Sequence, residues 1–309
     1  MTTRDAKARR SDHRTRLTVW VALSANLVIA AAKTAGGLIA GSPALLSEAA
    51  HSVADTLNEV FLLASLRRSR RPADRRHPFG YGKERWFWSL LAAVGIFVMG
   101  GCFSFFQGYQ ALAGHHGEPS SRYAVGLAVL GVALLAEGTS LLRALHQFRT
   151  HGKDGRDPAL RTVLGEDSAA VLGVAFAMTG MSLHLATGEA VWEAGASFAI
   201  GLLLVYVAYR LGREARDQLI GQAVDPVLAS RIRELLAAQP EIDNVAALLT
   251  MRLGPDSALV AARVDLVPGL DSEEVELVSE RIKRTVARRW PEVDQVFLDI
   301  TEAPIGEEG

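Results

Sequence analysis

Six stretches of the chain are rich in apolar residues over lengths that suit membrane-spanning helices. A helix needs roughly 20 apolar residues to cross a hydrocarbon core of about 30 Å. The second and fifth stretches carry ionisable residues, so they score weakly on hydropathy and could instead be core helices of a soluble bundle. Six such stretches without a full polar face favour membrane spans over that alternative. The predicted spans cover residues 17–41, 43–66, 86–108, 123–145, 161–185 and 191–209.

From residue 217 onward the pattern changes to that of a small soluble domain. Asp225 followed by Pro226 marks a helix start, because an N-cap residue followed by proline favours the first helical turn. Two runs of alternating or β-branched residues flank a Gly-Pro-Asp-Ser turn, which predicts a hairpin. A helix and a third strand follow, so the order αββαβ predicts an antiparallel three-stranded sheet with helices on one face. The predicted helices cover 226–238 and 271–289, and the predicted strands cover 244–253, 258–267 and 293–301.

The formal net charge of -1 hides two oppositely charged parts of the chain. Residues 1–216 contain 24 Lys or Arg against 16 Asp or Glu, a net charge of +8, whereas residues 217–309 contain 9 against 18, a net charge of -9. The basic residues of the first part gather before the first span, between the second and third, between the fourth and fifth, and after the sixth. The positive-inside rule therefore places both termini in the cytoplasm. We expect a basic cytoplasmic N-terminus at 1–16, a membrane domain at 17–216 and a cytoplasmic domain at 217–309.

The same sequence disfavours several classes of protein. The single cysteine, Cys102, excludes an intrachain disulfide framework and any CxxC metal or redox site. No HExxH run is present, which argues against an intramembrane metalloprotease. Nucleic acid is not needed to explain the arginine-rich segments, because they lie beside predicted spans. The N-terminus lacks a signal-peptide pattern, so we expect a retained first helix, and the residue usage and short loops favour a bacterial plasma membrane.

The second predicted span carries a stripe of polar residues on one helix face. Glu48, His51, Asp55 and Asn58 are spaced three, four and three residues apart, so they share a face. Ionisable groups at membrane depth cost several kcal/mol unless they face a partner or a water-filled path. This stripe is therefore the first candidate for a functional site.

His51 and Asp55 can present an imidazole nitrogen and a carboxylate oxygen to one metal ion. The alternative interpretation is an inter-helix hydrogen-bond pair. Other spans supply further partners: Asn26 and Lys33 lie on one face of the first, and Glu137 and Ser140 lie on one face of the fourth. The fifth carries Glu166 and Asp167, which point about 100° apart. Either of these two carboxylates could instead cap the start of its helix.

Two runs resemble the cation diffusion facilitator family: GSPALLSEAAHSVAD at 41–55 and HPFGYGKER at 77–85. Together they are highly specific, and the likeness covers nearly the whole chain. The run EDSAAVLGV at 166–174 is similar to the branch of this family typified by zinc transporter nine.

The resemblance implies a homodimeric, proton-coupled exporter of divalent metal with six spans, cytoplasmic termini and a ferredoxin-like C-terminal domain. It also implies a metal site shared by the second and fifth spans, in which His51 and Asp55 match the family's second-span ligands. The fifth span departs from the family's HxxxD or DxxxD pattern, because neither Glu166 nor Asp167 is followed by a ligand four residues later. Glu166 or Asp167 with water, or Glu137, would then complete the site.

The loop between the second and third spans matches part of a second family site. Asp74 and His77 stand at family positions, but Tyr81 replaces the second histidine. No histidine follows His184, so the sequence lacks the His-rich site that some family members have in the cytoplasmic domain. The residues expected to form an accessory metal site or a proton path are Glu48, Asn58, Glu137, Asp74 and His77.

These patterns predict a metal/proton antiporter that works by alternating access, not an enzyme. Metal binding needs a neutral His51 and ionised carboxylates, so loading would release protons. We expect Zn²⁺ as the transported ion, with Mn²⁺, Fe²⁺ or Co²⁺ as alternatives because oxygen-rich sites suit harder ions. We expect no prosthetic group, and the expected partners are the bilayer, the metal and a second copy of the chain, without nucleic acid. A membrane metal sensor or scaffold that has lost transport is the alternative from another class.

Overall fold

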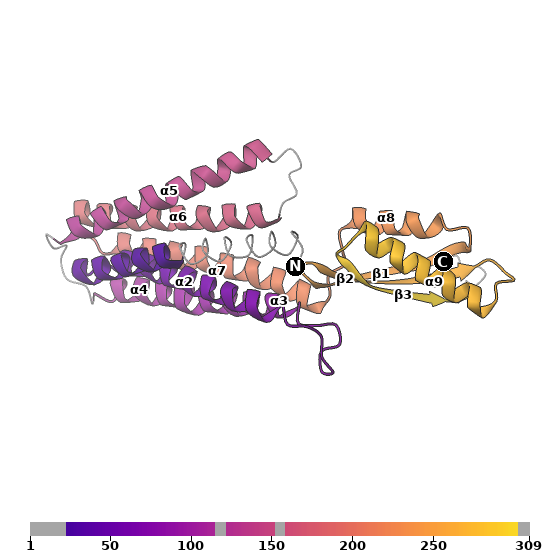
Figure 1. The fold of residues 1–309 in the computed structure, drawn as a ribbon. Helices are drawn as coiled ribbons and strands as arrows, with labels where there is room; N and C mark the ends of the chain where they lie inside the picture. The colour runs from indigo at the N-terminus through magenta and orange to yellow at the C-terminus, as the bar shows by residue number, and fades with distance from the viewer. Residues whose placement is uncertain (1–22, 115–121, 152–157, 302–309) are drawn as a thin grey trace, which may run out of the picture. The chain divides into compact units, whose positions relative to one another are not determined.

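The computed structural model describes residues 23–114, 122–151 and 158–301 (Figure 1). Backbone contacts divide the chain into two compact units. The helical unit comprises Met1–Ala64 and Trp88–Arg213, and the α/β unit comprises Ser65–Phe87 and Glu214–Gly309. The predicted basic N-terminus, the start of the first span and the loop residues 152–157 lie outside the described residues.

Long helices that run lengthwise beside one another build the helical unit (Figure 1). The third expected span is one continuous helix, Glu84–Leu112, which contains a π-helical stretch in its middle. Each of the six predicted spans therefore coincides with a helix within the described part of the chain. The helices are Leu23–Ala40, α2 (Pro43–Arg68), α3 (Glu84–Gly95), η1 (Ile96–Cys102), α4 (Phe103–Leu112), α5 (Tyr123–His151), α6 (Pro158–Thr187) and α7 (Val191–Ile220).

Five of the described helices are long and apolar enough to cross a membrane. Among the helices at the six predicted spans, α2 is long enough, with 26 residues, but its polar stripe keeps it from being apolar enough. Large apolar side chains point away from the bundle, for example Val132 and Leu135 of α5, which are 70% and 72% exposed. An apolar outer surface of this extent suits lipid, so the unit is that of a multi-pass membrane protein.

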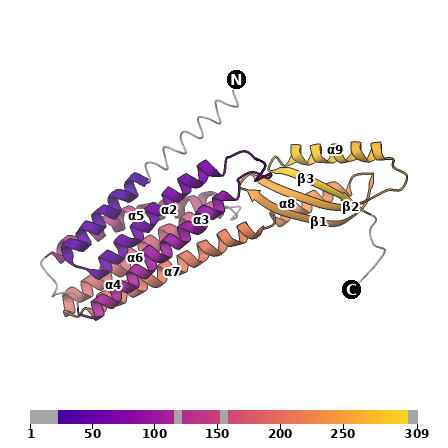
Figure 2. The ribbon, with the colours of Figure 1, turned by 90° about the horizontal axis from the view of Figure 1, so that it is seen from below.

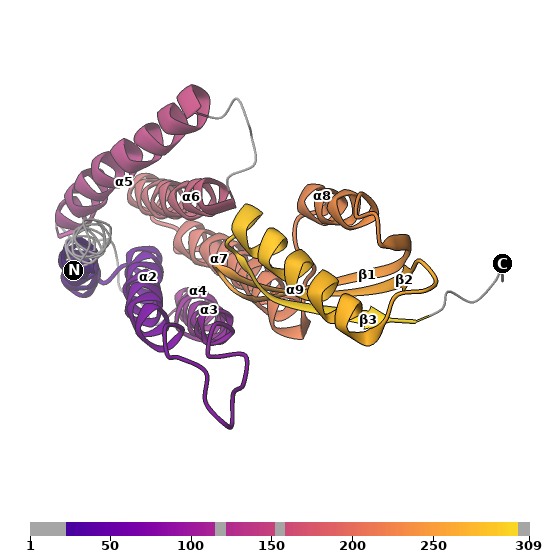
Figure 3. The ribbon, with the colours of Figure 1, turned by 45° about the vertical axis from the view of Figure 1, so that its right-hand side comes forward.

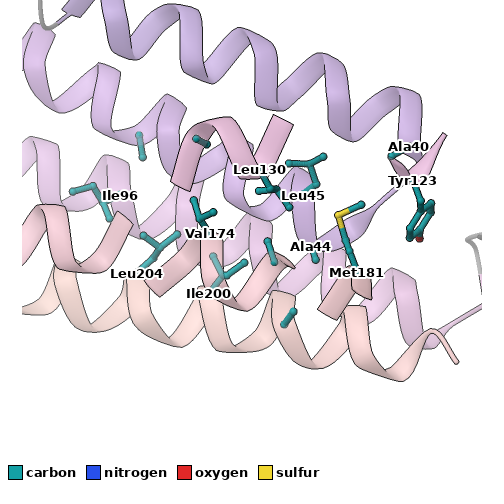
Figure 4. Close-up of a cluster of buried hydrophobic side chains, with 14 of the residues drawn as sticks. Ala40, Ala44, Leu45, Ile96, Tyr123, Leu130, Val174, Met181, Ile200 and Leu204 are labelled. Atoms are coloured by element: carbon teal, nitrogen blue, oxygen red, sulfur yellow. The ribbon is translucent and has the colours of Figure 1, made fainter. Parts of the chain in front are cut away.

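The core of the helical unit is formed where α2, α5, α6 and α7 meet (Figure 4). Alanine residues allow close approach of the helices, and larger side chains fill the remaining space. The large side chains buried there include Leu45, Leu130, Met181, Ile200 and Leu204.

A buried carboxylate links four helices near one edge of this core. Glu193 at the start of α7 is 1% exposed. Its Oε2 accepts hydrogen bonds from Ser42 Oγ at 2.5 Å and from the Ala44 amide at 3.3 Å, at the start of α2. Its Oε1 accepts from the Tyr123 hydroxyl of α5 and lies 2.9 Å from His184 Nδ1 of α6. This Glu193 cluster was not predicted from the sequence.

Replacing Glu193 with Ala should destabilise the helical unit, because it leaves buried donors without an acceptor. Each such group costs about 1–3 kcal/mol, which corresponds to a fall in melting temperature of roughly 2–12 °C for a unit of this size. Thermal unfolding of the detergent-solubilised protein measures this, with Glu189→Ala, an exposed carboxylate four residues earlier, as the control. Equal melting temperatures for the two variants would contradict the structural role of Glu193.

The α/β unit contains the predicted αββαβ order (Figure 2). Its first helix is capped by Asp225, whose side chain accepts from the Val227 amide. Its second helix begins with a capping box between Asp271 and Glu274. Both helix starts predicted from the sequence are thus confirmed. The elements are α8 (Pro226–Ala237), β1 (Ile242–Gly254), β2 (Ser257–Leu266), α9 (Ser272–Arg289) and β3 (Val293–Ile300).

The sheet has the order β1-β2-β3 and is mixed, not antiparallel throughout. Strands β1 and β2 pair antiparallel, as a hairpin requires, but β2 and β3 pair parallel. The prediction of a fully antiparallel sheet is wrong because α9 connects β2 to β3, and a crossover helix returns the chain to the end where β2 started. Helices α8 and α9 share one core with the buried face of β2 (Figure 3), formed by Ile232, Leu236, Val260, Ala262, Val264, Ile282 and Val286 among others.

The loop between α2 and α3 belongs to the α/β unit because it packs on the hairpin. A Cβ atom at Gly82 would overlap the Leu253 carbonyl and lie 2.8 Å from Gly254 Cα. Lys83 Nζ lies 3.4 Å from the Leu219 carbonyl. Only glycine at position 82 allows this approach of two backbones.

Candidate metal site

The polar stripe of α2 faces the interior of the helix bundle. Glu48 is fully buried and His51 is 3% exposed. Asp55 lies one turn further along the helix, and 38% of its side chain is exposed. The i, i+3, i+4 spacing therefore places the stripe as predicted, with its Asp55 end more open than its Glu48 end.

His51 lies between two carboxylates of its own helix. Its Nε2 is 3.4 Å from Asp55 Oδ2, and its Nδ1 is 3.6 Å from Glu48 Oε2. Within the described part of the chain, His51 Nδ1 and Glu48 Oε2 are buried and make no hydrogen bond. Buried polar atoms without partners are rare in folded proteins and call for an explanation such as an ion or a functional role. Imidazole and carboxylate, which lie side by side at His51 Nε2 and Asp55, are ligand types suited to a divalent metal.

Helix α6 closely approaches Glu48 and His51 at Gly173. A Cβ atom there would overlap Glu48 Oε2 and lie 3.3 Å from His51 Nδ1. Glycine is therefore needed for α6 to pack at this level of α2.

Lys33 of the first helix joins Glu48 of the stripe to the partly buried Glu137 of α5. Its Nζ donates to Glu48 Oε1 at 2.9 Å, to Glu137 Oε1 at 2.6 Å and to Ser52 Oγ at 2.9 Å. Lys33 itself is fully buried. Glu48 and Glu137, expected as accessory residues, are thus brought together by Lys33, one of the possible partners predicted on other spans.

Glu166 and Asp167 lie on α6 and face different neighbours. Glu166 Oε1 is 3.5 Å from Asn58 Nδ2 of α2, whereas Asp167 Oδ2 accepts from Ser140 Oγ of α5 at 3.0 Å. Helix α6 begins at Pro158, so both carboxylates lie about two turns inside it. They therefore do not cap the helix start, and that alternative is excluded.

The predicted ligands are assembled only in part. His51 and Asp55 are adjacent, and Asn58 reaches the same stretch of α6 as Glu166. Among residues 23–114, 122–151 and 158–301, no three His, Cys, Asp or Glu side chains are close enough together to hold one ion. The shared site of the second and fifth spans therefore stays a prediction.

Asp74 and His77 lie in the loop of the α/β unit, apart from the stripe in sequence and fold. Both oxygens of Asp74 are already used: Oδ2 accepts from the Tyr81 hydroxyl at 2.7 Å, and Oδ1 accepts from the amides of His77 at 2.7 Å and Arg76 at 2.9 Å. Tyr81, which replaces the second histidine, thus donates a hydrogen bond to the Asp74 carboxylate. The hydrogen bond from Tyr81, followed by those from the backbone, lowers the pKa of Asp74 below its ordinary value.

Replacing Tyr81 with Phe should raise the pKa of Asp74 toward its ordinary value, because the largest stabilising contact of the carboxylate is removed. A lowered folded-state pKa stabilises the loop at any pH above the ordinary carboxyl value of about 3.9, and this contribution is lost as pH falls through the folded value. NMR titration of labelled aspartate measures the change, with Tyr209→Phe, an exposed tyrosine of α7, as the control. An unchanged Asp74 titration in Tyr81→Phe would contradict the assigned contact.

The sequence placed Lys33 among the possible partners on other spans but did not pair it with a particular carboxylate. Its contact with Glu48 could have been predicted, because a lysine inside an apolar span needs a carboxylate beside it. The contact of Gly173 with Glu48 could not, since only the three-dimensional packing defines which helix comes close to which.

The fold and the stripe define a multi-pass helical membrane protein with buried ionisable groups. A sequence model described as the cation efflux transmembrane domain matches residues 19–220 of the chain. The chain therefore belongs to the cation efflux, or cation diffusion facilitator, family, which is a family of divalent metal cation transporters and not of enzymes.

Several curated proteins are similar along most of the chain. The proton-coupled zinc antiporter SLC30A9, mitochondrial, of Xenopus laevis is 31% identical over 79% of this chain, and metal tolerance protein C4 of Arabidopsis thaliana is 31% identical over 91%. The chain spans 46% and 62% of the lengths of these two relatives. The cation-efflux pump FieF of Cronobacter sakazakii is 28% identical over 83% of each chain.

Proposed function

We propose that the protein exports zinc in exchange for protons and binds the metal at His51 and Asp55. The observation that carries this proposal is the adjacent pair on α2, buried His51 and partly exposed Asp55, with Nε2 and Oδ2 3.4 Å apart and His51 Nδ1 without a partner in the described residues. Relatives named as a proton-coupled zinc antiporter and as a cation-efflux pump support it. One imidazole with carboxylates favours Zn²⁺, and Mn²⁺, Fe²⁺ and Co²⁺ are the alternative ions.

Proton coupling follows from the ligand chemistry. A metal binds neutral imidazole and ionised carboxylate, so any protons on these groups leave when the ion binds. Imidazole has an ordinary pKa near 6.5, which suits exchange at physiological pH. Either Glu166 or Asp167 of α6 together with water, or Glu137 of α5 instead, then completes the coordination shell.

We further propose that α2 also crosses the membrane, which makes six spans in all, and that both termini lie in the cytoplasm. The family match at 19–220 includes all of α2, and its Ala44 and Leu45 pack in the bundle core. The basic loops favour this orientation by the positive-inside rule. The proposed domains are a basic segment at 1–16, the membrane domain at 17–216 and a ferredoxin-like cytoplasmic domain at 217–309, in a bacterial plasma membrane.

Removing both ligands should abolish transport. In proteoliposomes with a pH gradient, His51→Ala combined with Asp55→Ala should lower Zn²⁺ flux more than tenfold, since even residues that only orient a metal ligand change affinity by about 10–100-fold. His146→Ala, an exposed histidine of α5, serves as the control and should retain flux. Unchanged flux in the double variant would overturn the assignment.

A non-transporting metal sensor or scaffold is the second candidate function. It is favoured by the finding that, in the part of the chain that the structure describes, no three ligand side chains converge on one point. This candidate predicts Zn²⁺ binding that depends on His51 and Asp55 but no flux in the same proteoliposomes.

We also propose a homodimer formed through the α/β unit. Leu249, Ala261 and Phe297 are register partners across the three strands, on the sheet face opposite the core. Leu249 and Phe297 are 68% and 50% exposed. A row of exposed apolar side chains on a sheet face supports an interaction surface.

Leu249→Asp should weaken this dimer, because it places a charge in the apolar row. A central interface residue contributes about 2 kcal/mol or more, so the dissociation constant should rise roughly 30-fold. Light scattering of the purified protein measures the mass. Leu277→Asp on α9 is the matched control, since Leu277 is a leucine of nearly equal exposure, 66%, outside the sheet. Equal masses for both variants would contradict the proposed interface.

A further inference from the structure

Lys33 has the surroundings of a bound cation. The side chain is fully buried, and its ammonium group is surrounded by three oxygens from two other helices: Glu48 and Ser52 of α2 and Glu137 of α5. The distances of 2.6 to 2.9 Å use all three N–H donors of the ammonium group. We call the three oxygen-bearing side chains the oxygen cage.

The charges of the cage are not fully balanced by Lys33. Two carboxylates surround one ammonium group, and Oε2 of both Glu48 and Glu137 is buried without a hydrogen bond in the described part of the chain. Without Lys33, the bundle would contain two adjacent buried carboxylates and no cation between them. An oxygen-only donor set of this kind binds hard divalent cations such as Mn²⁺.

Glu48 connects the cage to the proposed transport site. One of its oxygens binds Lys33 at 2.9 Å, and the other lies 3.6 Å from His51 Nδ1. Glu48 therefore lies between a cation in the cage and the imidazole ring whose Nε2 faces Asp55. Whatever occupies the cage consequently sets how much negative charge Glu48 presents to the metal site.

We propose that the Lys33 ammonium group is a built-in cation that fills the oxygen cage, so that the helical bundle accepts one divalent ion at His51 and Asp55 and excludes a second. This inference rests on the proposed function, because it takes these two residues as the transport site. Lys33 is thereby a residue that determines ion number and ion preference, and not only a link between helices.

Metal binding to the purified full-length protein tests this proposal by equilibrium dialysis with Zn²⁺ or Mn²⁺ alone. Lys33→Met should bind one more ion per chain than the unmodified protein and should bind Mn²⁺ at least tenfold more tightly. Lys33→Arg, which keeps the charge, should bind the same number of ions as the unmodified protein. Lys33→Met combined with Glu48→Gln and Glu137→Gln should lose the additional ion. An unchanged ion count and Mn²⁺ affinity in folded Lys33→Met would overturn the proposal.

If Lys33→Met does not fold, Lys33→Gln with Glu137→Gln removes one charge of each sign. Glu48 then lacks its cation, so Zn²⁺ should bind at least tenfold more tightly, and unchanged Zn²⁺ affinity would overturn the proposal. His51→Ala with Asp55→Ala separates this inference from the proposed function. If the double variant keeps all of its Zn²⁺ binding, the assignment of the transport site is contradicted. An additional ion bound by Lys33→Met would still support the proposal for the cage.

Discussion

The free-energy cost of buried charge governs the arrangement of the helical unit. An isolated charge inside a bundle costs several kcal/mol, so a buried ionisable group must meet a partner, and two of them meet partners from other helices. Lys33 does so with carboxylates of α2 and α5, and Glu193 does so with donors at the ends of α2, α5 and α6. These two polar clusters fix the relative register of the helices, which apolar packing with many alanines specifies less strictly.

The Glu193 cluster and the His51–Asp55 pair differ in how tightly their polar groups are bound. Every polar contact of Glu193 is a direct hydrogen bond, and the cluster is almost completely buried. His51, in contrast, has carboxylates at 3.4 and 3.6 Å, beyond ordinary hydrogen-bond length, and Asp55 is partly exposed. The first arrangement suits a permanent link between helices. The second suits a group that exchanges partners, as a proton-coupled metal site must.

The sequence predicted those features in which chemistry and periodicity coincide. Charged residues in an apolar segment stand out, so the stripe from Glu48 to Asn58 could be placed on one helix face. The Glu193 cluster could not, because its members come from the ends of separate helices and each is an ordinary polar residue near a helix end. The parallel pairing of β2 and β3 was missed because strand order was considered without the direction that the α9 crossover imposes. The contact of Gly173 with Glu48 was not predicted, because the sequence does not define which helices come close to each other.

Binding of metal at His51 and Asp55 is tested most directly by X-ray absorption at the zinc edge of the full-length protein loaded with one Zn²⁺ per chain. The ligand set predicts one imidazole nitrogen and a majority of oxygen ligands at about 2.0–2.2 Å, without sulfur. The imidazole contribution should disappear in His51→Ala. A spectrum with two or more imidazole ligands, or one that is unchanged in His51→Ala, would contradict metal binding at this site.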